Sequence, residues 1–105
     1  MKLIVIAAAA ALLATGASAQ SYPDKPITVV VPFAAGGPTD KVARDLGVAL
    51  GAVLKQTVII DNVGGAGGTL GATKVAKAAP DGYTLLLHHI GMSTSPGLYR
   101  KLAFN

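Results

Sequence analysis

Two short glycine-rich segments are the parts of this sequence best suited to chemistry. Residues 34–38 read AAGGP and residues 64–68 read GGAGG. Each follows an apolar run and precedes a helix-like pattern, so its backbone N–H groups lie at the positive end of a helix dipole. Glycine clears side chains from such a turn and lets a ligand approach the backbone. We therefore expect the two segments to bind an anion, although glycines that only close tight turns remain the alternative.

Neither segment is a nucleotide-binding motif. A P-loop requires G-x-x-x-x-G-K-[ST], and neither segment contains it. The G-x-G-x-x-G pattern also fails, because Gly65 and Gly67 fit its spacing but Leu70 takes the third glycine position. The acidic residue expected at the end of the next strand is missing, since His88 and His89 stand there. The sequence therefore disfavours a dinucleotide site.

The polar side chains form no evident catalytic or metal-ligating set. Adjacent residues of a strand point to opposite faces, so we do not expect His88 and His89 to bind one ion. The sequence has no Cys and no Glu, and its five Asp are not at ligand spacing. There is also no GxSxG motif, and no acidic residue follows the histidines. We expect no enzymatic activity, no cofactor and no metal; one histidine should line the pocket edge, and hydroxyls at 93–95 could donate hydrogen bonds.

The elements that must position these turns follow a β-α-β-α-β order. Apolar, mostly β-branched runs at 27–31, 57–60 and 83–88 predict strands of a parallel sheet that is covered on both faces. Helical patterns begin at 38 and at 70, and residues 90–105 are polar and turn-rich. The predicted fold class is α/β, a three-layer parallel sheet with right-handed crossovers, which is half of a doubly wound fold.

Each predicted helix has an apolar stripe that we expect to face the sheet. In the first helix the stripe comprises Val42, Leu46, Ala49, Leu50 and Val53. In the second helix, 70–79, it comprises Ala72, Val75, Ala76 and Ala79, with Lys74 and Lys77 outward. Gly47 and Gly51 would weaken the first helix unless their small size lets it sit close to the sheet.

The first nineteen residues have the pattern of a secretory signal peptide. Lys2 precedes the apolar run 3–13, and Ala17-Ser18-Ala19 supplies the small residues that a signal peptidase needs. We predict cleavage after Ala19, which leaves a single domain over 20–105; a buried or membrane-anchoring helix is the alternative. Removing Lys2 lowers the net charge from +4 to +3. The remaining positive charges are scattered and aromatic residues are few, which disfavours nucleic-acid binding.

Three blocks of the chain carry a family resemblance: YPDKPITVVVPFAAGGPTDKVAR, IIDNVGGAGGTLGATKVAKAAPDGYTLLL and SPGLYRKL. Together they resemble the N-terminal lobe of the Bug-type substrate-binding receptors of tripartite tricarboxylate transporters. The resemblance implies a monomeric periplasmic protein with a two-lobed "Venus flytrap" fold. It also implies that the receptor binds a small carboxylate and delivers it to membrane permease subunits. Which carboxylate is bound does not follow from the resemblance.

The resemblance also implies which residues contact the ligand. In the first glycine segment it suggests Phe33 as an apolar wall, Gly36 and Gly37 as positions of close approach, and Thr39 and Asp40 at the helix start. Asp40 suits a cap or a loop brace better than an anion contact. In the second segment it suggests three backbone donors, namely Ala66, Gly67 and Gly68. We add His89, the histidine that we expect at the pocket edge.

The chain departs from the family pattern in three places. Gly64 stands where the family often has Pro, His88-His89-Ile90 replaces a run of small residues, and Ser95 precedes Pro96 where Asn is common. The second lobe and the hinge are also missing from this sequence, so we expect weakened affinity. Two further alternatives stay open: an exported α/β enzyme fragment with its catalytic residues elsewhere, or a truncated product without function.

Overall fold

The computed structural model describes residue 19 and residues 21–104. The predicted signal peptide and its cleavage site therefore lie almost wholly outside the described residues. Along the chain, the elements are β1 (Ile27–Val31), α2 (Pro38–Leu54), β2 (Val58–Asn62), the 3₁₀ turn η2 (Ala66–Gly68), α3 (Thr69–Ala76), β3 (Thr84–Leu86) and α4 (Gly91–Leu98).

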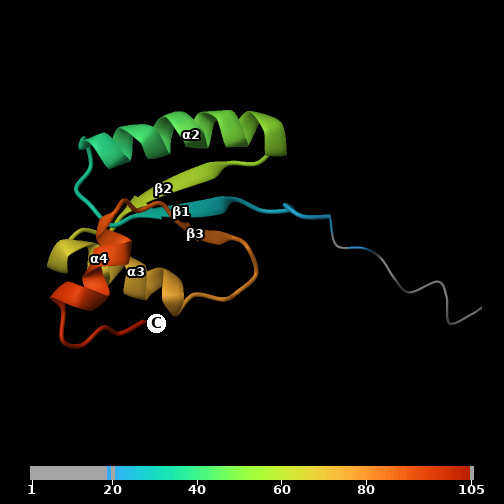
Figure 1. The fold of residues 1–105 in the computed structure, drawn as a ribbon. Coiled ribbons are helices and arrows are strands. Elements are labelled where there is room, and N and C mark those ends of the chain that lie inside the picture. The colour runs from blue at the N-terminus through green and yellow to red at the C-terminus, as the bar shows by residue number, and fades with distance from the viewer. Residues whose placement is uncertain (1–18, 20, 105) are drawn as a thin grey trace, which may run out of the picture.

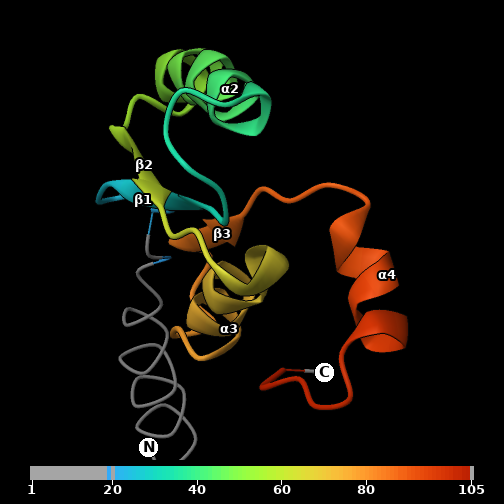
Figure 2. The same ribbon diagram turned by 90° about the vertical axis from the view of Figure 1, so that its left-hand side faces the viewer.

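The three strands form one parallel sheet in the order β2-β1-β3, which confirms the predicted class. Strand β1 is central and pairs with β2 from Ile27↔Val58 to Val31↔Asn62. Helix α2 packs against β1 and β2 on one face, and α3 packs against β1 and β3 on the other (Figures 1 and 2). Because β1 is covered on both sides, four of its five residues are buried, as its almost wholly apolar sequence requires.

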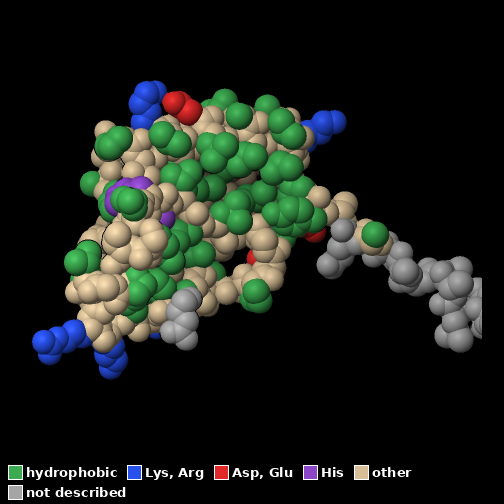
Figure 3. Space-filling view, viewed as in Figure 1, with side chains coloured by type: hydrophobic (Ala, Val, Ile, Leu, Met, Phe, Trp, Pro, Cys, Tyr) green, Lys and Arg blue, Asp and Glu red, His purple; other side chains and the backbone are tan. Residues whose placement is uncertain are grey.

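Helix α2 does not turn its predicted apolar stripe to the sheet. Val42 and Val53 are 58% and 78% exposed, and Leu46 is also exposed. Figure 3 shows hydrophobic side chains gathered on the surface over α2 and the sheet beneath it. The buried residues of α2 are Asp40, Ala43 and Gly47. The prediction of an inward Val42–Val53 stripe was therefore wrong.

The small residues explain the orientation of α2. A Cβ atom at Gly47 would lie 3.4 Å from the side chains of both Val58 and Ile60 on β2. The helix axis therefore comes closer to the sheet along the Ala43–Gly47 stripe than a stripe of Val and Leu would allow. This confirms that the small size of Gly47 serves close packing.

The C-terminal third differs from the sequence prediction in three respects. Helix α3 ends at Ala76 instead of 79, and Ala76 and Ala79 are exposed. Strand β3 ends at Leu86 instead of 88. The segment predicted as a loop contains α4, which includes Pro96. Its hydroxyl side chains bond backward to helix carbonyls, as in Ser95 Oγ–H to Gly91 O at 2.6 Å, so residue types that suggest a loop are accommodated in a helix.

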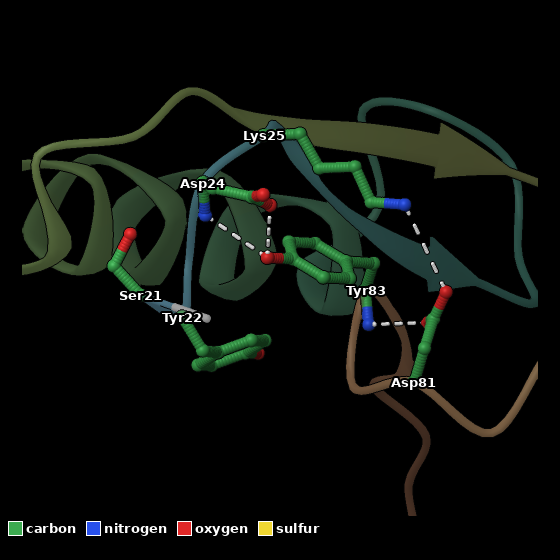
Figure 4. Close-up of a pocket in the computed structure, with 6 residues that line it drawn as sticks. All are labelled: Ser21, Tyr22, Asp24, Lys25, Asp81 and Tyr83. Atoms are coloured by element: carbon green, nitrogen blue, oxygen red, sulfur yellow. Dashed lines mark hydrogen bonds and ion pairs between the residues drawn. The ribbon is translucent and has the colours of Figure 1, made fainter. Parts of the chain in front are cut away.

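Residues 22–24, which precede β1, are hydrogen-bonded to the segment before β3 (Figure 4). The hydroxyl of Tyr83 donates to Asp24 Oδ1 at 2.6 Å and accepts from the Asp24 N–H at 2.9 Å, and this carboxylate raises the pKa of Tyr83. The Tyr22 hydroxyl donates to Gly82 O at 2.6 Å. A cavity of about 460 Å³ lies here, at the amino ends of β1 and β3. Within the described part of the chain, no helix is long and apolar enough to cross a membrane.

Gly71 provides a test of the close packing between α3 and β1. A Cβ atom at Gly71 would lie 2.7 Å from Pro32 Cβ and 3.0 Å from Val63 O, and backbone atoms cannot move aside cheaply. Overpacking costs about 1–3 kcal/mol and outweighs the helix propensity gained by Ala, so we expect Gly71→Ala to lower the free energy of unfolding. The control is Gly97→Ala in α4, where nothing lies within 4 Å of the new Cβ. Urea unfolding of both variants checks this; equal stabilities would contradict the packing account.

Candidate functional site

The two glycine segments meet at the carboxyl end of the sheet. Strands β1 and β2 end in register at Val31 and Asn62, so the loops that follow them leave the sheet side by side. A Cβ atom at Gly64 would lie 3.6 Å from the Ala34 backbone nitrogen, which shows that the loops touch. In an open parallel sheet, the carboxyl ends of the strands are where ligands bind.

Asp40 braces the first loop from the first turn of α2. It is only 3% exposed, and its Oδ2 accepts from Arg44 Nε at 2.9 Å and from the Gly36 N–H at 2.8 Å. Its Oδ1 accepts from Asn62 Nδ2 at 2.9 Å. These bonds, above all the one from Arg44, hold the pKa of the Asp40 carboxyl well below its usual 3.8. The brace predicted for Asp40 is confirmed, and its oxygens are occupied by the protein's own donors.

Asn62 links the brace to both loops, and sequence reasoning missed it. Its Nδ2 also donates to the carbonyl oxygen of Phe33 at 3.2 Å, and its Oδ1 accepts from Arg44 Nη2 at 3.3 Å. The only sequence signal was a polar residue at the carboxyl end of an apolar strand. Through Asn62, the end of β2, the end of β1 and the start of α2 form one hydrogen-bonded unit.

The tip of the first loop is open. Gly36 has φ +87°, a conformation that favours glycine, and no atom lies within 4 Å of where its Cβ would stand. Gly37 has an ordinary φ of −78° and caps α2, with Pro38 in the first helical turn. Because the helix starts here, the first N–H groups, including that of Thr39, have no partner inside α2.

The second loop winds through a run of positive φ. The φ angles are +123° at Gly65, +47° at Ala66, +62° at Gly67 and +93° at Gly68. The Gly68 N–H donates to Gly65 O at 3.0 Å, so this donor is used inside the loop. This N–H is already engaged within the loop, and the ligand-donor role of Gly68 stays a prediction. Ala66 and Gly67 begin the 3₁₀ turn, where N–H groups lack an intrahelical acceptor.

Side chains of the protein itself also require glycine in the second loop. A Cβ atom at Gly67 would clash with the Tyr99 hydroxyl. A Cβ atom at Gly68 would lie 2.6 Å from His88 Nε2 and 3.4 Å from Phe33 Cζ. Tyr99, just after α4, gave no sequence signal. Its contact with Gly67 depends on the position of α4, which was not predicted.

Both histidines join Phe33 in one aromatic cluster. The Phe33 ring stacks on His89 with centroids 4.4 Å apart and meets His88 edge-on at 5.3 Å, and the two histidine rings are 5.1 Å apart. The expectation that His88 and His89 point to opposite faces was wrong, because β3 ends before them and strand alternation no longer applies. The described residues contain no group of three or more His, Cys, Asp or Glu placed to hold a metal ion.

A cavity of about 250 Å³ joins the histidines to the start of α2. Its lining is formed by Pro38, Thr39, Val42, Leu87, His88 and His89. The structure thus brings together the predicted residues Thr39 and His89. The hydroxyls of Ser93 and Thr94 instead donate to carbonyls of their own helix region, at Ile90 and Gly91.

The sheet order, the two touching loops and the open helix starts are those of part of a periplasmic binding protein. Residues 42–105 match the family described as tripartite tricarboxylate transporter family receptor, and the chain belongs to this family. It is 51% identical over 104 residues to a UPF0065 protein from the TAR-I ttuE-ttuC' intergenic region of Agrobacterium vitis. That match covers 98% of this chain and 30% of the relative. Protein BugT of Bordetella pertussis is 42% identical over 97% of this chain and 33% of its own length.

Solved structures agree with this assignment. The periplasmic binding protein BugD superposes with a TM-score of 0.78 at 55% identity, covering 80% of this chain and 28% of BugD. MatC from Rhodopseudomonas palustris, solved with bound malate, superposes at 0.76 with 50% identity, over 80% of this chain and 29% of MatC. An R. palustris protein with adipate superposes at 0.76 with 36% identity, over 81% and 29%. The chain thus spans about three tenths of the length of these relatives.

The brace around Asp40 predicts a specific response to acid. Because its folded-state pKa lies below the usual 3.8, Asp40 contributes stability that is present above about pH 4 and is lost as the pH falls toward the folded-state value. We expect Asp40→Asn to melt at a lower temperature than the parent at pH 7. The difference in melting midpoint should shrink as the pH is lowered to about 3.

The matched control is Asp45→Asn, which removes an exposed ion pair with Lys41 in the same helix. Such a pair contributes about 0–1 kcal/mol, so this variant should follow the parent at every pH. Thermal melts recorded by circular dichroism across the pH range provide the comparison. An Asp40→Asn protein that melts with the parent at pH 7 would contradict the brace.

Proposed function

We propose that this chain is the N-terminal ligand-binding lobe of an extracytoplasmic receptor that captures a small carboxylate for a tripartite tricarboxylate-type transporter. The observation that carries the proposal is the pair of touching glycine loops, each at a strand's carboxyl end and each leading into the start of a helix. Unpaired N–H groups and helix dipoles favour an anion at such a place. The malate and adipate bound to the two R. palustris relatives support the same ligand class, namely small dicarboxylates.

In this proposal the backbone holds the ligand and the side chains shape the site. Gly37 and Thr39 in the first loop and Ala66 and Gly67 in the second present backbone N–H groups to one carboxylate. Gly36, whose own N–H donates to Asp40, lets the ligand approach the loop closely. Each charge-assisted hydrogen bond of this kind contributes about 1.5–3 kcal/mol. Asp40 positions the first loop without touching the ligand, which keeps its negative charge away from the anion.

Phe33 and the histidines form the wall next to this carboxylate. The Phe33–His89 stack supplies an apolar and largely rigid surface. We also place His89 at the pocket edge, and its position in the lining of the cavity beside Thr39 supports this role. In this proposal no residue transfers a proton to the ligand or attacks it, so the proposed role is binding and not catalysis.

Membership of the receptor family supports the rest of the proposed role. The receptor would be exported by the signal peptide, cut after Ala19, and would act as a monomer in the periplasm. A second lobe, in sequence beyond this chain, would close over the ligand and present it to membrane permease subunits. One lobe leaves much of the ligand in water, so affinity for the isolated chain should be far below that of a closed receptor.

A melting experiment tests the ligand class. A ligand at about 100 times its dissociation constant adds about 2.7 kcal/mol to the free energy of unfolding. We expect the melting midpoint of the purified chain to rise with malate or succinate and to stay unchanged with NAD. A rise with NAD, or none with any carboxylate at high millimolar concentration, would contradict the proposal.

Gly37→Val tests the role of exposed backbone. Gly37 has an ordinary φ and its Cβ would meet only Ala34 O at 3.5 Å, so a side chain fits there without strain. The Val side chain would keep the carboxylate away from the backbone N–H groups of the loop. We expect carboxylate affinity to fall at least about tenfold, which corresponds to the loss of one charge-assisted hydrogen bond, while the free energy of unfolding changes little. Ala52→Val, at an exposed position near the other end of α2, is the control and should bind as the parent does. Ligand-detected NMR titration measures both affinities. Unchanged affinity of Gly37→Val would contradict binding of the carboxylate by the backbone of the first loop.

A further inference from the structure

We propose that His88 determines which carboxylates this site accepts, by donating a hydrogen bond from its Nε2–H to a second carboxylate of the ligand. This inference rests on the proposed function, because it concerns the same site. It makes His88, and not its neighbour His89, the specificity-determining residue.

The hydrogen bonds of the His88 ring fix where its proton lies. The His89 backbone N–H donates to His88 Nδ1 at 2.8 Å, and an N–H group can only donate. The His89 carbonyl oxygen is farther from the same nitrogen, at 3.1 Å. His88 Nδ1 is therefore an acceptor, and the neutral ring carries its hydrogen on Nε2.

That Nε2 lies where the two loops meet. It stands 2.6 Å from the position of a Cβ on Gly68, the residue that caps α3, and the ring meets Phe33 of the first loop edge-on. The ring also lines the 250 Å³ cavity together with Thr39 at the start of α2. A ligand that binds both loops therefore passes close to this donor.

The Nε2–H of His88 is open to a ligand. Among the described residues, the only hydrogen-bond partners of the His88 ring are those of Nδ1. No buried side-chain nitrogen or oxygen in this part of the protein lacks a partner, so Nε2 is not buried. The donor is therefore accessible to solvent, and a ligand oxygen can accept its hydrogen bond.

The surroundings of His88 select against an apolar ligand end. A ligand that places a methyl group against Nε2–H displaces water without replacing its hydrogen bond, whereas a carboxylate oxygen accepts that bond. Succinate and butyrate both have four carbons and differ in this one end. We expect the parent to bind succinate about tenfold more tightly than butyrate, the effect of one hydrogen bond to a charged group.

The experiment measures both affinities by NMR titration of the purified chain. His88→Met removes the donor and keeps an apolar side chain of similar length, and His88→Gln keeps an N–H donor. We expect the ratio of succinate to butyrate affinity to fall toward one in His88→Met, and His88→Gln to retain most of the ratio of the parent. The control Val53→Met adds the same side chain at a position that is 78% exposed near the far end of α2, outside the site, and should keep the preference.

The outcomes separate this proposal from the proposed function. If His88→Met keeps the preference of the parent, or if Val53→Met loses it to the same extent, the role of His88 is overturned while carboxylate binding stays intact. A parent chain that binds neither acid would contradict the proposed function and this inference with it. If His88→Met does not fold, the side-chain ¹⁵N signals of His88 in the parent test whether Nε2 contacts the second carboxylate. Nε2 should shift with succinate and not with butyrate, and equal responses would overturn the proposal.

Discussion

One buried carboxylate holds the ligand end of this protein together. Asp40 sits in the first turn of α2, and its two oxygens accept hydrogen bonds from Arg44, Gly36 and Asn62. Burying an anion is costly unless donors surround it, so the arrangement is stable only when all three segments are in place. The loop after β1, the start of α2 and the end of β2 are thereby locked to one another. The proposed site depends on these hydrogen bonds of Asp40, because backbone N–H groups bind a ligand well only when the loop that carries them has a fixed conformation.

The second loop is held by a different means. It has no buried carboxylate, and its shape comes from a run of positive φ angles with His88 and Tyr99 set against Gly68 and Gly67. The glycines thus serve two purposes at once, backbone exposure and close packing by side chains from distant parts of the sequence. The His88 contact joins the end of β3 to the start of α3, so all three strands contribute to the site.

Much of the fold could be predicted from the sequence. The apolar run 27–31 and the glycine segments around 36 and 67 are local signals, and local signals gave the parallel sheet, the element order and the position of the site. The orientation of α2 could not be predicted from its apolar stripe, because the close approach allowed by Gly47 outweighed hydrophobicity. Asn62 and the convergence of His88 with His89 were also missed. Both depend on where a strand ends in three dimensions, which alternation along the sequence does not report.

Among the described residues, we expect the carboxylate to bind at the carboxyl end of the sheet and nowhere else. An amide-resolved ¹H–¹⁵N NMR titration of the purified chain with succinate tests it most directly. We expect the signals of Gly36, Gly37, Thr39, Ala66 and Gly67 to shift together with one dissociation constant. The larger cavity around Asp24 and Tyr83, at the opposite end of the strands, should show no such response. Shifts concentrated around that cavity, with the loop amides unchanged, would show that the carboxylate binds elsewhere.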